Sequence, residues 1–213
     1  WISSVLAPVS FFSAYDPSVI STPMSEWISK RGPGLNRWFF KMGKVFTNSW
    51  AKPLYAFRQE LGLPKGESPF FEAQHSPYLT LALFSKHFAA PQQDWPQNSQ
   101  ATGFLFYDGV EQDLEPELES FLQAGDPPAV FTLGSAAVYS AGDFYLDSLE
   151  AVKKLSTRAV LLVGQEGLKT MPRSLPKNVF VAAYAPYSKL FSRASAVVHQ
   201  GGIGTTAQAL RAA

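Results

Sequence analysis

The fold of this chain is decided by residues 195–206, which read SAVVHQGGIGTT. The apolar run 196–198 is typical of a short strand, the glycines predict a turn, and 205–213 predicts a helix. Such a turn leaves free backbone N–H groups at the positive end of the helix dipole, where glycines let phosphate oxygens come close. His199, at the end of the strand, adds a donor. The stretch therefore predicts an anion site, although a purely structural turn with His199 in the core fits the same residues.

The composition of the 213 residues narrows the class of protein. The chain is 46% hydrophobic and 14% aromatic, and its 16% of charged residues lies below the roughly 25% of an average soluble domain. The net charge of +1 gives no indication of a nucleic-acid partner. The absence of cysteine excludes disulfides, thiolate metal sites and a cysteine nucleophile, and it fits a reducing compartment. No apolar run reaches the roughly 18 residues of a membrane span. We expect a cytoplasmic protein, with peripheral membrane contact as an option.

The first half of the chain mixes strand and helix patterns. The predicted elements are strands within 1–12, over 78–84 and over 101–107, and helices over 35–50 and 54–61. Helix 35–50 has the strongest apolar periodicity, and we expect its aromatic stripe, which includes Trp38 and Phe46, to lie in the core. Lysines such as Lys41 and Lys52 are expected on a solvated face, with a membrane surface as the alternative. His75 and His87 are isolated from other ligand residues, so no metal site is predicted.

The pattern becomes regular after an acidic stretch that begins at Asp108, where we place a domain boundary between 1–107 and 108–213. The predicted elements that follow are helix 115–123, strand 129–133, helix 143–155, strands 158–163 and 178–182, helix 186–193, strand 196–198 and helix 205–213. Alternating apolar strands and helices predict right-handed βαβ units and a parallel sheet. The chain begins at Trp1 and stops inside a helix, so we expect a piece of a longer protein.

Three polar residues follow three of these strands, namely Ser135, Tyr184 and His199. Parallel strands end at one edge of their sheet, and ligands bind at that edge. Ser135 offers a hydroxyl, Tyr184 a ring on which a base can stack, and Ala185 a backbone group for a base edge. Thr205 and Thr206 could contact phosphate or cap the helix. For each of these residues a purely structural role is the alternative.

The run VVHQGGIGTTAQALRAA, residues 197–213, resembles the signature of nucleotide-sugar-dependent glycosyltransferases of the two-domain GT-B fold. The branch that it resembles most is the sterol 3-beta-glucosyltransferase-like enzymes and their bacterial relatives. Other matches occur in the same order along the chain: FFSAYDP (11–17), LGLP (61–64), DWP (94–96) followed by TGF (102–104), ESFLQAGDPPAVFTLGS (119–135) and YAPYSKLFSRASAVVH (184–199). The implied fold is α/β, with two Rossmann-like domains that are both incomplete in this chain.

The resemblance implies a role for each matching residue. Residues 1–107 would be the end of the acceptor-binding domain and 108–213 the first part of the domain that binds the sugar donor. The implied donor contacts are Ser135, Tyr184, Ala185, Tyr187, His199, Gly201, Gly202, Gly204 and Thr205. Tyr187 stands where plant relatives carry a glutamine, and Ile203 where they carry an asparagine. The catalytic base of the family is a histidine near the start of the acceptor domain, upstream of this chain, so no catalytic residue is named.

The resemblance implies an inverting, metal-independent transfer of a hexose. The donor would be a UDP- or dTDP-sugar, used as a co-substrate without any further cofactor. The acceptor would be a hydroxyl on an apolar molecule such as a sterol, a lipid or a polyketide. Two alternatives remain open, a nucleotide-sugar epimerase of the same fold and a non-catalytic relative that only binds a nucleotide.

Overall fold

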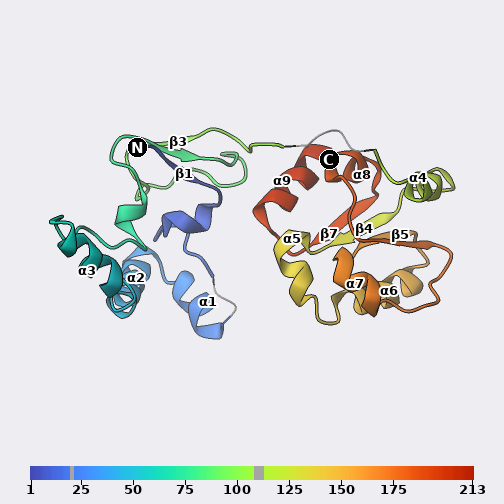
Figure 1. Ribbon diagram of the computed structural model, residues 1–213, viewed down its shortest axis with the longest axis horizontal. Coiled ribbons are helices and arrows are strands. Elements are labelled where there is room, and N and C mark those ends of the chain that lie inside the picture. The colour runs from blue at the N-terminus through green and yellow to red at the C-terminus, as the bar shows by residue number, and fades with distance from the viewer. Residues whose placement is uncertain (20–21, 108–112) are drawn as a thin grey trace. The chain divides into compact units, whose positions relative to one another are not determined.

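The computed structural model describes residues 1–19, 22–107 and 113–213. They form two compact units, Trp1–Leu105 and Phe106–Ala213 (Figure 1). The division lies two residues before the predicted end of the first domain. Asp108, where the boundary was placed, lies outside the described residues. Each unit has its own parallel sheet, so the predicted α/β class with parallel sheets is confirmed.

The second unit is a four-stranded parallel sheet in the order β6-β5-β4-β7. Its strands are β4 (Ala129–Thr132), β5 (Ala159–Leu162), β6 (Val179–Ala182) and β7 (Ala196–His199). Its helices are α4 (Pro116–Gln123), α5 (Gly134–Ala137), α6 (Phe144–Leu155), α7 (Gly164–Thr170), α8 (Tyr187–Leu190) and α9 (Ile203–Ala212), with short 3-10 turns η3 (Val138–Ser140) and η4 (Phe191–Arg193). Of these helices, α5 and α7 were not predicted.

Alternate side chains of the central strands enter two separate cores, one on each face of this sheet. Val160 and Leu162 of β5 pack with residues of α4, α8 and α9, whereas Ala159 and Leu161 pack with α6. The phenol of Tyr145 on α6 donates a hydrogen bond to the Leu162 carbonyl at 2.6 Å. A parallel sheet must be covered on both faces, and this three-layer arrangement buries every residue of β5, whereas the edge strand β7 stays partly exposed.

The first unit has a smaller sheet, with the order β1-β2-β3. Its strands are β1 (Ser3–Val5), β2 (Thr80–Ala82) and β3 (Ser99–Ala101), its helices are α1 (Pro23–Ser29), α2 (Pro33–Thr47) and α3 (Lys52–Glu60), and its 3-10 turns are η1 (Pro8–Phe11) and η2 (Glu72–Gln74). The core beside the sheet contains Phe11, Phe84 and Trp95, with the rings of Phe11 and Trp95 stacked at 4.1 Å.

Two predictions for the first unit are wrong. The strand expected over 101–107 is instead Ser99–Ala101, because Gly103, with φ +88°, turns the chain out of the extended conformation and Leu105 is exposed. The aromatic stripe of helix 35–50 is not core, since the only buried residue of α2 is Asn36. Helix α2 instead turns Asn36 inward, where its amide donates a hydrogen bond to the Ala14 carbonyl at 2.9 Å, while Trp38 and Phe46 face solvent. No helix in the described part of the chain is long and apolar enough to cross a membrane.

Candidate functional site

The carboxyl ends of the four strands in the second unit form one edge of the sheet. Thr132, the last residue of β4, is in register with His199, the last residue of β7. Ser135 lies just beyond β4, and Tyr184 just beyond β6. The structure therefore places the three predicted polar residues at the same edge, while their roles toward a ligand stay predictions.

The glycine turn connects β7 directly to the start of helix α9. Gly201 has φ +86°, a conformation that side chains other than glycine rarely adopt. Gly202 is the N-cap residue, and no side chain caps the helix. The N–H groups of the first turn, on Ile203, Gly204 and Thr205, therefore have no partner within the helix. No acidic residue lies in this first turn, so the positive end of the dipole is available to an anion.

The turn that follows His199 favours one tautomer of its neutral ring. The backbone N–H of Gly201 donates a hydrogen bond to Nδ1 of His199 at 3.1 Å. Because a backbone amide can only donate, Nδ1 must be the acceptor, and the proton of the neutral ring then lies on Nε2. The ring thus presents a donor N–H to a ligand at the strand end, which suits a phosphate oxygen.

Tyr187, the first residue of α8, connects two parts of the site. Its hydroxyl lies 3.0 Å from Oγ1 of Thr132 at the end of β4 and also hydrogen-bonds Thr205 of α9. Burial raises the pKa of Tyr187, which keeps the phenol neutral and able to serve in both bonds. The predicted contact of Tyr187 with a nucleobase stays untested, and its hydroxyl is engaged within the protein.

Tyr184 and Ala185 have opposite environments although they are neighbours in sequence. Tyr184 is 61% exposed, and its ring lies 6.3 Å from that of Tyr187 at an angle of 36°. Ala185 is only 3% exposed and packs in the core of the second unit, so the contact of its backbone with a base edge stays a prediction. The exposed ring of Tyr184 is a suitable platform for a base.

Two residues of this edge, Gln200 and Thr132, were missed in the sequence. A methyl group built on Gly134 would lie 2.8 Å from Nε2 of Gln200, so the amide of Gln200 lies close against the turn after β4. Thr132 accepts a hydrogen bond from the Gly134 N–H at 3.3 Å. Thr132 could have been found from the sequence, because it is a polar residue in an otherwise apolar strand. Ser135, at the start of α5, is exposed.

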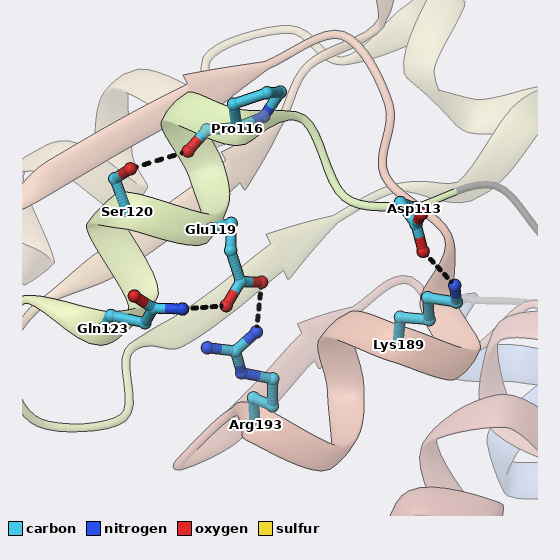
Figure 2. A network of polar contacts seen from close by, with 7 residues as sticks. All are labelled: Asp113, Pro116, Glu119, Ser120, Gln123, Lys189 and Arg193. Atoms are coloured by element: carbon cyan, nitrogen blue, oxygen red, sulfur yellow. Dashed lines mark hydrogen bonds and ion pairs between the residues drawn. The ribbon is translucent and has the colours of Figure 1, made fainter.

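Charged side chains tie helix α4 and the residues just before it to the segment that carries Tyr187 (Figure 2). Glu119 binds Arg193 at 2.5 Å, and Asp113 binds Lys189 at 2.7 Å. The hydrogen bond from Arg193 and then that from Gln123 hold the pKa of Glu119 below its usual value. Hydrogen bonding by Lys189 likewise lowers the pKa of Asp113. These pairs help to hold α8 and η4 against α4 and the residues before it.

The other candidate residues do not gather into a second site. His75 stacks on Phe11 at 5.4 Å, and burial lowers its pKa. His87 is exposed. Among residues 1–19, 22–107 and 113–213, no group of three or more His, Cys, Asp or Glu side chains could hold a metal ion.

The chain is similar in sequence to several glycosyltransferases, although no family model matches it. It is 37% identical over 158 residues to O-mycaminosyltylonolide 6-deoxyallosyltransferase of Streptomyces fradiae, which covers 73% of this chain and 36% of that enzyme. It is 33% identical over 133 residues to a sterol 3-beta-glucosyltransferase of Arabidopsis thaliana, covering 61% of this chain and 20% of that enzyme. The chain thus spans about a third or less of the length of these relatives.

Solved structures show the same architecture. The chain superimposes on a glycotransferase of kitacinnamycin with a TM-score of 0.61 at 20% identity, covering 89% of this chain and 44% of the other. It superimposes on the glycosyltransferase SnogD from Streptomyces nogalater with a TM-score of 0.51 at 27% identity, covering 63% and 37%. The predicted resemblance to these enzymes and their fold is therefore confirmed.

Proposed function

Because the chain is homologous to part of the GT-B glycosyltransferases, we propose that it carries the donor site of an enzyme of this kind. The whole protein would transfer a hexose from a UDP- or dTDP-sugar to a hydroxyl of an apolar acceptor. One observation carries the proposal: His199, the glycine turn and the uncapped start of α9 lie together at one edge of a parallel sheet. These groups are all hydrogen-bond donors.

The donors suit the charge that develops during glycosyl transfer. When the bond between sugar and diphosphate breaks, negative charge grows on the leaving diphosphate. Donors fixed before the reaction stabilise this charge without reorganisation. His199 would donate from Nε2, and Ile203, Gly204 and Thr205 from the backbone. We propose that this site works without a metal and that the transfer inverts the anomeric centre, in line with the family that the sequence resembles.

A cavity in the first unit supports an apolar acceptor. It has a volume of about 280 Å³, close to the lower end of typical ligand cavities. Its lining is largely aromatic and aliphatic, and includes Phe12, Ile28, Phe39, Phe40 and Phe71. The names of the relatives point the same way, since one gives O-mycaminosyltylonolide as the acceptor and another gives a sterol.

The first test is calorimetric titration with UDP, dTDP, ADP and inorganic phosphate, using wild type and His199→Ala. We expect UDP or dTDP to bind well above phosphate, and the variant to lose at least about tenfold in affinity, roughly 1.4 kcal/mol. His87→Ala is the matched control, because His87 is exposed in the first unit. Equal loss in both variants, or no diphosphate binding by protein of full natural length, would reject the donor site.

Product analysis tests the chemistry separately from binding. The full-length protein is incubated with the nucleotide sugar that binds, with and without an apolar alcohol, and the products are separated. A glycosylated alcohol plus free nucleoside diphosphate is the expected result. A changed sugar still attached to its nucleotide would instead indicate an epimerase. Binding without any product, over a range of alcohols, would indicate a non-catalytic relative.

A further inference from the structure

Helices α2 and α3 expose the more apolar of their faces to solvent. Val45 and Phe46 on α2 are 70% and 72% exposed, and Trp50, at the corner between the helices, is 72% exposed. Trp38 and Met42 extend the stripe along α2, because residues four and seven positions apart share a helix face. The inward face of α2, by contrast, carries Asn36, Phe40 and Gly43. Such a contiguous exposed patch marks an interaction site.

Helix α3 continues the same surface. None of its residues is buried. Leu54, Phe57 and Leu61 are exposed at spacings of three and four residues, which places them on one face. Two successive helices thus present bulky apolar side chains to the outside of the first unit. An amphipathic helix with Trp, Phe and Leu on one face is the kind that lies in the headgroup region of a bilayer.

The charge of this segment identifies the partner. Residues 33–65 contain six basic residues (Arg37, Lys41, Lys44, Lys52, Arg58 and Lys65) and one acidic residue, Glu60, for a net charge of +5. The whole chain has a net charge of only +1, so the remaining residues carry a net charge of −4. Lys41 and Lys52 are exposed and form no ion pair with another described residue. A surface that combines exposed tryptophan with unpaired lysine attracts anionic lipid headgroups.

From this combination we propose that the outer face of α2 and α3 docks on the surface of an anionic lipid bilayer. The apolar stripe enters the headgroup region, and Lys41 and Lys52 bind lipid phosphates. The inward face of the same helix α2 lines the apolar cavity through Phe39 and Phe40. One helix therefore separates the proposed lipid contact from the cavity. The inference does not depend on glycosyl transfer, since vesicle binding is measured without donor or acceptor.

The test uses flotation of the full-length protein with vesicles of phosphatidylcholine, with or without phosphatidylglycerol. We expect binding to the anionic vesicles, and a fall of at least about tenfold in affinity for Lys41→Glu/Lys52→Glu. Lys154→Glu/Lys177→Glu is the matched control, with the same change of charge at exposed lysines of the second unit. The control should bind as wild type. Absence of vesicle binding, or equal loss in both double variants, would overturn the proposal.

A second measurement distinguishes lipid from protein as the occupant of this face. The 213 residues contain no cysteine, so Val45→Cys introduces a reporter once any cysteine elsewhere in the full-length protein is replaced. We expect a water-soluble maleimide to label this cysteine quickly in free protein and slowly in the presence of anionic vesicles. Slow labelling without vesicles would show that another segment or a second copy covers the face, and would overturn the proposal.

Discussion

The two units of this chain use apolar residues in different ways. In the second unit, among the described residues, clusters of nine and eight buried side chains lie on the two faces of the sheet. The first unit buries a cluster of five beside its sheet, although it contains all five tryptophans of the chain. Its aromatic residues largely line a cavity or face solvent. The same apolar periodicity therefore goes with burial in the second unit and with exposure in the first.

The largest expected effect follows from truncating the second core. Leu161, fully buried in β5, changed to Ala should lower the free energy of unfolding by about 2–5 kcal/mol, because a cavity is left. Val45→Ala on the exposed stripe should change it by less than about 0.5 kcal/mol. Urea unfolding followed by circular dichroism measures both variants. Tryptophan fluorescence reports the first unit alone, because residues 106–213 contain no tryptophan. Equal losses of unfolding free energy in the two variants would contradict the difference drawn here between the two units.

The next effect tests the turn after β4. Gly134 has φ +67°, and an added methyl group would lie 2.8 Å from Gln200 and 3.1 Å from Oγ1 of Thr205. We expect Gly134→Ala to cost about 1–3 kcal/mol of stability and to weaken UDP binding by displacing Gln200. Gly142 is the matched control, since it has φ +51° with nothing within 4 Å. Gly142→Ala should introduce only the backbone strain. Its affinity for UDP, measured by titration, should therefore equal that of wild type. Equal UDP affinities for the two variants would show that the turn after β4 does not contribute to UDP binding.

The sequence predicted the second unit better than the first for a physical reason. Each of its strands is a short apolar run between turn residues, and covered parallel strands need that pattern. The short helices α5 and α7 were missed because Gly134 and Gly164, both with positive φ, look like loop residues in sequence. In the first unit, the stripe of Trp38 and Phe46 has the same periodicity whether it faces the core or the solvent.

The candidate site, too, could be predicted from local sequence patterns only in part. The edge of the sheet could be predicted from polar residues at or just beyond the ends of the predicted strands, such as His199. The link from Tyr187 to Thr132 joins residues 55 positions apart, and local patterns contain no information on such pairs. The position of Gln200 against Gly134 likewise depends on the register of β4 with β7.

A smaller effect tests whether Tyr187 positions the site from within. Tyr187→Phe removes the hydrogen bond to Thr132 and should cost about 1 kcal/mol of stability. It should also weaken phosphate binding through Thr205, while preserving the stacked ring. Tyr184→Phe is the control, because that ring is exposed and its loss of a hydroxyl should leave stability unchanged. If Tyr187→Phe instead changes the preference between UDP and ADP and leaves stability intact, Tyr187 contacts the base.

The smallest effect concerns the ion pair that holds α4 to η4. Hydrogen bonding by Arg193 lowers the pKa of Glu119 in the folded state, so this carboxylate contributes stability above about pH 4.5 that is lost as the pH falls further. Glu119→Gln should therefore be slightly less stable at neutral pH and should lose less stability on acidification.

Glu150→Gln is the control. The pKa of Glu150 is also lowered, but its partner Lys153 lies three residues away in the same helix. Urea midpoints at neutral and acid pH measure both variants. Because the Glu119 pair joins two elements and the Glu150 pair only one, a larger change for Glu150→Gln would show that the exposed pairs of Figure 2 do not anchor the core of this unit.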